Sequence, residues 1–222
     1  MTLELSGKAA LVTGASRGLG RALAEALGAR GAEIIAVART VGGLEELDDA
    51  IRAAGGPGAT LVPLDVTDDP GLERLGAAIH QRWGRLDLWV HAAVHAPPLS
   101  PAEHADAKDW DKTFAVNARA TARLIRVVDP LLRAAPAGRA VFFEDLVNTG
   151  PFHGAYAASQ AAARALTGAW AEEAAAFRHE VLHLAPPAMP TALRARFRPG
   201  EDREALTPPA AAAAALLPDL LG

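Results

Sequence analysis

The chain contains no cysteine, which excludes disulfide bonds, thiolate metal ligands and thiol catalysis. Aromatic residues make up only 5% of its 222 residues while hydrophobic residues make up 50%, so we expect a core built mostly of alanine, leucine and valine. The net charge of −4 provides no basic surface for nucleic acid. We therefore predict no nucleic-acid partner.

Long apolar runs are also missing. No run of about 18 apolar residues could cross a membrane, and the N-terminus lacks the charged and then apolar pattern of a signal peptide. We therefore expect a cytoplasmic protein without a membrane partner, folded as one domain over residues 1–222. His91 and His95 show H-x-x-x-H spacing just past a predicted strand, without the intervening glutamate of a zincin, so we predict no metal site.

Strand-like apolar runs alternate with helix-like runs along the chain. This alternation predicts an α/β fold with a doubly wound parallel sheet and helices on both faces. The predicted strands are 9–12, 34–37, 60–62, 86–90, 140–143 and 181–184. The predicted helices are 21–30, 42–53, 70–83, 109–134 and 155–177, with a last helix over 210–215 that has proline in its first turn.

A glycine-rich turn, Gly14-x-x-x-Gly18-x-Gly20, joins the first predicted strand to the first predicted helix. Glycine allows the tight turn and the close approach of backbone to a phosphate, and the helix start offers N–H groups and a positive dipole end to an anion. Strand, glycine turn and helix in this order predict a dinucleotide site. The cofactor-binding residues expected in this turn are Gly14, Ser16, Arg17, Gly18, Leu19 and Gly20.

With Thr13 before it, this turn resembles that of the short-chain dehydrogenase/reductase (SDR) family, and later stretches follow the order of that family's motifs from about Lys8 to about Leu217. The resemblance implies a Rossmann-type fold and an oxidoreductase that transfers a hydride between a nicotinamide cofactor and a carbonyl or alcohol. SDR sheets usually have a seventh, glycine-rich strand, and no stretch before Gly222 fits it. We expect a sheet of six strands; the alternative is a sheet of seven whose last strand lies outside these 222 residues.

The charge pattern after the second predicted strand favours NADP over NAD. NAD-selective sites place an acid there to bind the ribose 2′-OH, whereas Arg39 stands here and Arg17 lies in the glycine turn. Both arginines could pair with a 2′-phosphate, and the alternative is two solvated surface arginines. The resemblance further implies that Asp65 and Val66 contact the adenine; the alternative for Asp65 is to cap the next turn.

The resemblance implies a catalytic set of Asn, Ser, Tyr and Lys, which this chain matches in part. Tyr156 falls in the family's Y-x-x-x-K segment as the proton donor, but the lysine position is Gln160, one helical turn away. Asn117 matches the family's relay asparagine, and Asp145 aligns best with the serine, with Glu144 as the alternative. The structural alternatives are a core tyrosine and a surface asparagine.

The residues expected at the nicotinamide end depart further from the family pattern. His91-Ala92-Ala93-Val94 replaces the family's N-N-A-G, and Pro186-Pro187 replaces Pro-Gly. Val94 and Pro187 stand in place of glycine, so the backbone there should be stiffer and bulkier. The cofactor contacts implied at this end are His91, Ala92, Ala93, Tyr156, Gln160, Pro186 and Thr191, the last at the carboxamide.

The change to Gln160 bears on proton transfer. Tyrosine has a pKa of about 10 in water, which a nearby cation lowers and an anionic Asp145 would raise. His91, His95 and His153 could substitute as proton donors. Two hypotheses follow: an NADP-dependent SDR oxidoreductase with a degraded catalytic tetrad, acting on an unidentified small carbonyl or alcohol, or a weak or inactive NADP(H)-binding protein that acts as a sensor or partner subunit.

The helices predicted over 109–134 and 155–177 correspond to those through which SDR proteins commonly pair. We expect a homodimer through these helices, with a tetramer also possible. The small residues that would permit close packing are Ala157, Ala161, Ala165, Gly168 and Ala169. The polar and charged segment 195–203 predicts no hydrophobic lid for a steroid or fatty chain.

Overall fold

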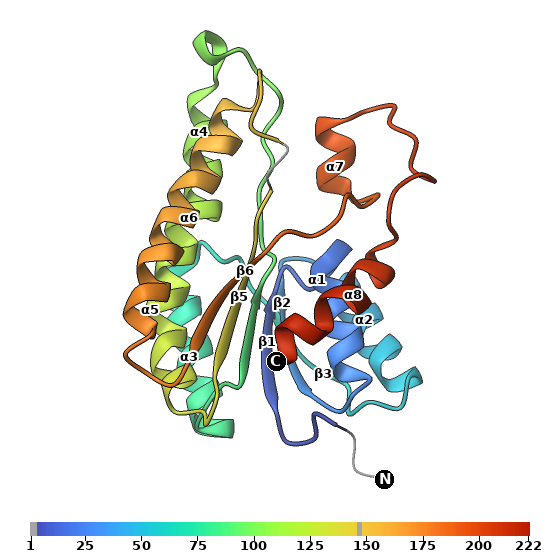
Figure 1. The fold of residues 1–222 in the computed structure, drawn as a ribbon, viewed down its shortest axis with the longest axis vertical. Helices are drawn as coiled ribbons and strands as arrows, with labels where there is room; N and C mark the ends of the chain where they lie inside the picture. Colours follow the sequence, from blue (N-terminus) through green and yellow to red (C-terminus); the bar gives the residue numbers. More distant parts are fainter. Residues whose placement is uncertain (1–3, 146–147) are drawn as a thin grey trace.

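The computed structural model describes residues 4–145 and 148–222. Its parallel strands form one six-stranded sheet in the order β3-β2-β1-β4-β5-β6, with helices on both faces (Figure 1). The strands are β1 (Ala9–Thr13), β2 (Glu33–Ala38), β3 (Ala59–Pro63), β4 (Leu88–His91), β5 (Arg139–Phe143) and β6 (Glu180–Leu184). The predicted α/β, Rossmann-type doubly wound sheet is confirmed.

The helices divide between the two faces of the sheet (Figure 1). One face carries α1 (Gly18–Gly28), α2 (Val41–Ala53) and α8 (Pro209–Leu221). The other carries α3 (Asp69–Trp83), α5 (Ala120–Arg133) and α6 (Gly154–Ala174). Beyond the sheet lie α4 (Ala107–Phe114) and α7 (Ala192–Phe197), and two short helical turns occupy Ala102–His104 and Ala115–Arg119.

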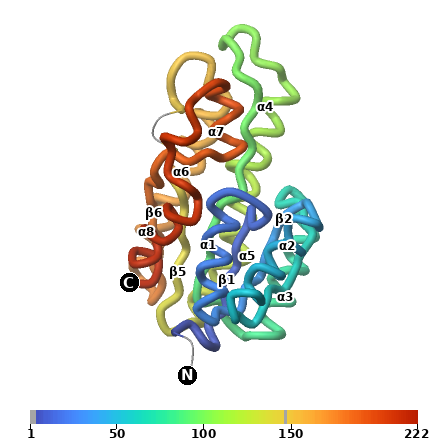
Figure 2. Tube along the Cα trace, turned by 90° about the vertical axis from the view of Figure 1, so that its right-hand side faces the viewer, coloured from blue at the N-terminus to red at the C-terminus, as the bar shows by residue number. Residues whose placement is uncertain are grey.

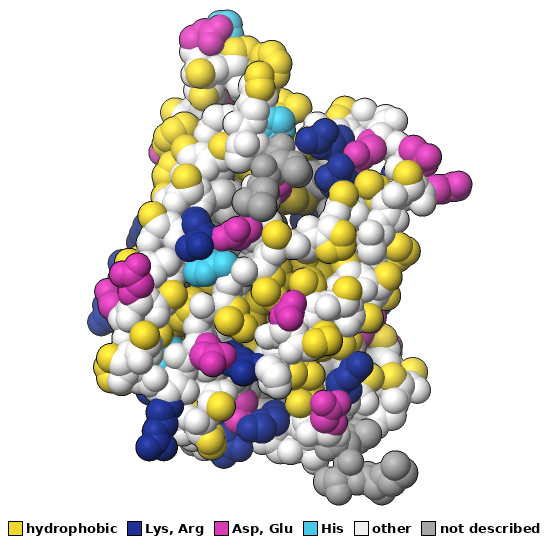
Figure 3. All heavy atoms as spheres, viewed as in Figure 1, with side chains coloured by type: hydrophobic (Ala, Val, Ile, Leu, Met, Phe, Trp, Pro, Cys, Tyr) yellow, Lys and Arg dark blue, Asp and Glu magenta, His cyan; other side chains and the backbone are white. Residues whose placement is uncertain are grey.

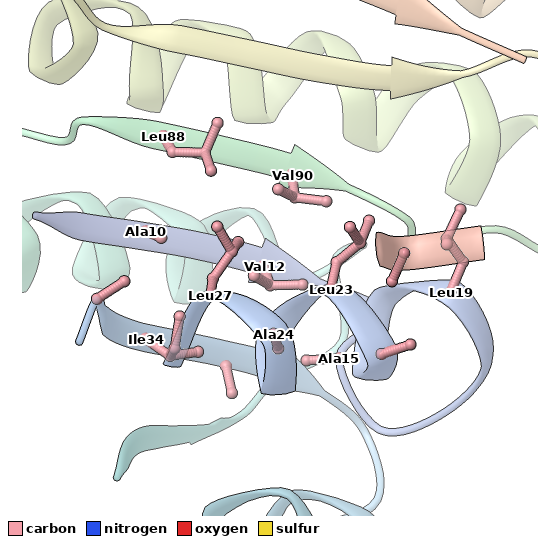
Figure 4. Packing of buried hydrophobic residues seen from close by; sticks show 14 of the residues in the cluster. Ala10, Val12, Ala15, Leu19, Leu23, Ala24, Leu27, Ile34, Leu88 and Val90 are labelled. Carbon is pink, nitrogen blue, oxygen red and sulfur yellow. The ribbon is translucent and has the colours of Figure 1, made fainter. Parts of the chain in front are cut away.

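The face under α1 is packed with alanine and leucine, as the composition predicts. Leu19, Leu23 and Leu27 lie at helical spacing on α1 and point toward the sheet (Figure 4). Leu23 and Leu27 are fully buried and lie beside Val12 of β1 and Val90 of β4. Each such leucine contributes about 1.5–3 kcal/mol, which fixes α1 and therefore the glycine turn that precedes it.

The opposite face holds a cluster of aromatic side chains. Trp89 of β4 is fully buried, with its ring centroid 5.1 Å from that of Phe142 and 6.1 Å from that of Trp170 on α6. Aromatic pairs in this range of distances prefer edge-to-face or tilted arrangements, as these do. The cluster fixes α6 against β5.

The helix predicted over 109–134 is instead interrupted. α4 ends at Phe114, a π-helical turn spans Ala115–Arg119, and α5 follows. Single π-helical turns often occur at functional sites. This one contains Asn117.

The C-terminal part differs from the sequence prediction in one element. The last helix is longer than the predicted 210–215 and has Pro209 in its first turn, as expected. α7 was not among the predicted helices. Among the helices of residues 4–145 and 148–222, none is both apolar and long enough to span a membrane.

On the face shown in Figure 3, acidic and basic side chains are interspersed, and neither sign forms a continuous block. The described residues contain no group of three or more side chains that could hold a metal ion.

Candidate functional site

The candidate site lies at the carboxyl edge of the sheet, at the top of Figure 1, where α7 and the segment before α4 project beyond the strands (Figures 1 and 2). In open α/β sheets ligands bind outside this edge, at the point where the strand order reverses. Here the order reverses between β1 and β4. The glycine turn follows β1, and Ala92 follows β4.

The glycine turn requires its glycines because backbone passes close to backbone. Gly14 has φ +74°, and a Cβ there would lie 2.6 Å from the Ala92 carbonyl oxygen. A Cβ on Gly20 would lie 2.5 Å from the Gly14 carbonyl oxygen. Gly18 has φ +58°, and a Cβ there would lie 3.4 Å from Thr191 Cγ2, so Thr191 lies beside the turn.

The start of α1 fits a phosphate group. Its N-cap, Arg17, makes no side-chain capping hydrogen bond, and its first turn contains no acid. By contrast, Asp68 caps α3 and Asp106 caps α4 with their own carboxylates. The first N–H groups and the positive dipole end of α1 are thus left for an external anion such as the pyrophosphate of a dinucleotide.

Asp65 caps the turn after β3. Its Oδ1 accepts hydrogen bonds from Thr67 N at 2.9 Å and Thr67 Oγ1 at 2.8 Å, and its Oδ2 lies 3.8 Å from Arg39 Nη1. Burial alone would raise the pKa of Asp65, but the two hydrogen bonds and the charges of Arg39 and Lys112 lower it overall. The capping alternative is therefore confirmed, and adenine contact by Asp65 and the buried Val66 stays a prediction.

His91 is the last residue of β4 rather than a residue past the strand. Its Nδ1 lies 2.8 Å from Thr13 Oγ1 and its Nε2 lies 3.1 Å from Thr121 Oγ1. Burial lowers the pKa of His91 to about 4, so the ring is neutral. With both ring nitrogens engaged inside the fold, the proposed role of His91 as a proton donor is wrong, and only its backbone remains for a cofactor.

Asn117 is buried, and its side chain ties two segments together. Its Oδ1 accepts from His95 N at 2.7 Å, while its Nδ2 donates to His95 O and to Ser159 Oγ, both at 2.9 Å. The alternative of a surface asparagine is wrong. Asn117 joins the segment after β4 to α6, and its role in a proton relay stays a prediction.

Tyr156, the only tyrosine of the chain, is 2% exposed, and its hydroxyl donates a hydrogen bond to Asp145 Oδ2 at 3.0 Å. The pKa of Tyr156 is raised well above its usual range, first by burial and then by the charge of Asp145 and this hydrogen bond. A hydrogen bond with Gln160 acts in the opposite direction but is the weakest of these influences. Tyr156 is thus neutral across the physiological range.

The two acids at the end of β5 have different partners. Asp145 also accepts hydrogen bonds from Asn148 N at 3.2 Å and Asn148 Nδ2 at 2.7 Å. Glu144 pairs instead with Arg164 on α6. The geometry therefore places Asp145, and not Glu144, at the Tyr156 hydroxyl.

Phe197, which ends α7, covers Tyr156 and could not be identified from the sequence. It is 5% exposed, and its ring centroid lies 4.8 Å from that of Tyr156 and 5.0 Å from that of His153. Phe197 is the one aromatic residue of segment 195–203, and the expectation that this segment forms no hydrophobic lid for a steroid or fatty chain stays a prediction. The sequence signal for α7 was Thr191, whose Oγ1 accepts from Arg194 N at 3.3 Å as an N-cap.

Further cations surround the site. The pKa of His95 is lowered, first by burial and then by the positive charges of Lys112, Arg196 and Arg39, with Asp109 acting the other way. His95 Nε2 is buried without a hydrogen-bond partner among the described residues. Lys112 and Arg196 were not identified from the sequence, because neither lies in a recognisable motif.

A cavity of about 370 Å³ opens beside Tyr156. Its walls come from the segment before α4, the start of α6 and the end of α7. The site therefore combines a glycine turn with an uncapped helix start, a buried tyrosine hydroxyl and a cavity at one edge of the sheet.

Residues 8–202 match the family model for short chain dehydrogenases, and the chain therefore belongs to that family. It is 34% identical over 163 residues to a short chain dehydrogenase of Pseudocercospora fijiensis, which covers 72% of this chain and 52% of the relative. It is 32% identical over 214 residues to benzil reductase ((S)-benzoin forming) of Saccharomyces cerevisiae, covering 92% and 80%. Its matches span about half the length of several curated relatives.

The fold is shared with a protein of Escherichia coli CFT073 described as a short chain dehydrogenase and solved in complex with NADPH. The two are 30% identical with a TM-score of 0.90, over 100% of this chain and 93% of the other.

Proposed function

We propose that this chain binds NADP(H) and acts as an oxidoreductase on a small carbonyl or alcohol compound, with Tyr156 as the proton donor. The observation that carries this proposal is the buried Tyr156, which lines a cavity of about 370 Å³ and donates its hydroxyl hydrogen to Asp145. Family membership and the cofactor-bound relative support the same reaction class.

The glycine turn and the uncapped start of α1 would hold the pyrophosphate. Arg17 and Arg39 are both exposed beside this turn and would pair with the 2′-phosphate, which favours NADP over NAD. Lys112 and Arg196 add positive charge around the same cleft. When bound, the nicotinamide would supply or take up the hydride, and Thr191, which lies beside the turn, would orient it.

The proton chemistry depends on Tyr156 and Asp145. In the reducing direction, the Tyr156 hydroxyl would give its proton to the substrate oxygen and become a tyrosinate. Asp145 disfavours that anion, and Gln160 offers a hydrogen bond without a charge. A positioned general acid contributes about 10²–10⁴-fold, and this site should forfeit much of it.

The reverse direction should be weaker still. Alcohol oxidation needs a tyrosinate to accept the alcohol proton, and the raised pKa of Tyr156 leaves almost none. We therefore propose a slow reductase. The second candidate, a cofactor-binding sensor or partner subunit without turnover, is favoured by the same two residues, Asp145 and Gln160.

Titration of protein fluorescence with NADPH and NADH tests the cofactor proposal. NADPH should bind more tightly, and Arg39→Ala should remove most of the difference while leaving NADH affinity nearly unchanged. Tighter binding of NADH would contradict the proposal. A panel of carbonyl compounds, followed by loss of NADPH absorbance, then separates a slow reductase from a sensor.

We also propose a homodimer through α5 and α6. The small residues Ala161, Ala165 and Ala169 are exposed along α6, where a second copy could approach closely. Light scattering at micromolar concentration should give the mass of a dimer, and a monomer would contradict this assembly.

A further inference from the structure

Exposed apolar side chains gather at the cavity beside Tyr156. Leu99 and Trp110 are each 39% exposed and Phe152 is 56% exposed, and all three line this cavity. The buried Phe197 lines it from α7. Soluble proteins rarely expose contiguous apolar patches without a binding function, so this group of side chains points to a ligand.

The walls of the cavity are held in place by the backbone. Ser100 N donates a hydrogen bond to Phe152 O at 3.1 Å, which ties the segment before α4 to the segment before α6. Phe152 has φ +69°, and no other non-glycine residue of 4–145 and 148–222 has a positive φ. Such strain persists only where surrounding structure enforces it, and it concentrates at ligand-binding sites.

The Trp110 ring is also fixed. It stacks on Phe114 of the same helix with ring centroids 4.9 Å apart and an interplanar angle of 26°. Aromatic side chains from three separate elements therefore line the cavity: Trp110 from α4, Phe197 from α7 and Phe152 from the segment before α6. Flat aromatic walls favour a flat aromatic guest, which packs against them edge-on or offset.

The charges around the cavity select against anions. Asp106 and Asp109 belong to its lining, and the described lining residues include no lysine or arginine. The cations Lys112 and Arg196 act instead on His95, on the side where the cofactor would bind. A carboxylate or phosphate on the substrate would meet two aspartates and no lysine or arginine, the other titratable lining residues being His104, His153 and Tyr156.

We infer that the cavity binds an uncharged aryl ketone or aldehyde, with its ring among Trp110, Phe152 and Phe197 and its carbonyl oxygen at the Tyr156 hydroxyl. This inference rests on the proposed function for the role of Tyr156. The volume of about 370 Å³ suits one or two fused rings, since small-molecule sites span about 300–1,000 Å³.

Calorimetric titration with 2-acetylnaphthalene in the presence of NADP⁺ tests the inference, because the oxidised cofactor cannot reduce the ketone. The full chain should bind the ketone, and Trp110→Ala and Phe152→Ala should each weaken binding about threefold to tenfold. Neither side chain belongs to the buried core, since Trp110 is 39% and Phe152 56% exposed, so these variants should fold. Phe177→Ala is the matched control, because Phe177 is 46% exposed but lies past the opposite end of α6.

An anionic probe tests the two acids separately. The anionic analogue 6-acetyl-2-naphthoate should bind at least about tenfold more weakly than the neutral ketone, and Asp106→Asn with Asp109→Asn should narrow that gap. Asparagine keeps the N-cap of α4.

The inference would be overturned if the ketone did not bind or if the two probes bound equally. It would also be overturned if Trp110→Ala and Phe177→Ala weakened ketone binding equally. Failure of NADPH to bind in a separate titration would instead refute the proposed function, whatever the ketone does.

Discussion

Replacing Asp145 should lower the pKa of Tyr156. In the native site the Tyr156 hydroxyl donates to Asp145 Oδ2, and burial, the Asp145 charge and this hydrogen bond all raise the pKa of Tyr156. Asp145→Asn removes the charge but keeps an oxygen that can accept the hydroxyl hydrogen. Asp145→Ser removes the carboxylate and restores the residue type that SDR enzymes generally use.

The size of the effect follows from the distance. At an effective dielectric constant of about 20, two unit charges 3.0 Å apart repel by about 5 kcal/mol. Asp145 is half-buried, so water screens part of this repulsion, and we expect a decrease of at least about 1 pKa unit, or about 1.4 kcal/mol. Burial remains in both variants, so the pKa of Tyr156 should stay above about 10.

The assay is direct because Tyr156 is the only tyrosine. The ultraviolet absorbance of tyrosinate, followed against pH, therefore reports this residue alone. In the wild type tyrosinate should appear only as the protein unfolds in alkali. The stability that the neutral buried hydroxyl provides is complete below the unfolded pKa of about 10 and is lost as the pH rises toward the higher folded value.

Both variants should titrate at lower pH than the wild type, with Asp145→Asn isolating the charge effect. If folded wild-type protein shows tyrosinate at or below pH of about 10, the argument from burial and Asp145 is refuted. An unchanged titration in Asp145→Asn would show that the Asp145 charge does not act on Tyr156.

Three further predictions concern the cofactor turn and the buried polar residues. Gly14→Ala should abolish NADPH binding in a fluorescence titration, because its Cβ would lie 2.6 Å from Ala92 O at φ +74°. The control Gly42→Ala, whose Cβ would meet nothing within 4 Å, should bind NADPH normally, and normal binding by both variants would contradict the turn geometry. Asn117→Ala should lower the free energy of unfolding in urea by about 1–3 kcal/mol, because His95 N would lose a buried partner, and no loss would contradict the bridging role. His91 has a pKa of about 4 in the fold, whereas in the unfolded chain it gains a proton below about pH 6.5. The free energy of unfolding should therefore decrease by up to about 3 kcal/mol as the pH is lowered from about 6.5 to about 4. His91→Gln should flatten this pH dependence in urea unfolding, and an equal slope in both proteins would refute it.

The sheet could be predicted from the sequence because its strands are continuous apolar runs between turn residues. Each predicted strand is present with bounds that differ by at most two residues at an end, as with 86–90 against Leu88–His91. The glycine turn was also predictable, because close backbone approach and positive φ leave glycine as the favoured residue.

The site was harder to predict where long-range contacts decide it. Helix α7 was not predicted, because segment 195–203 is polar and charged. Only the fold brings Phe197 against Tyr156. The sequence placed His91 just past a strand, but it is the last residue of β4 and its ring lies between Thr13 and Thr121. Adjacent acids in sequence, Glu144 and Asp145, take different partners because Arg164 on α6 captures the first.

The proposed proton transfer is tested most directly by steady-state NADPH oxidation on one responsive aryl ketone. The assay compares the wild type with the double variant Gln160→Lys with Asp145→Ser. We predict slow wild-type turnover, a large increase in the double variant and little change in NADPH affinity. Gln160→Lys alone should gain less, because Asp145 would pair with the new ammonium group. A wild-type turnover on the order of 10 per second, typical of enzymes, would contradict this mechanism, because it would require a proton route other than the Tyr156 hydroxyl held by Asp145.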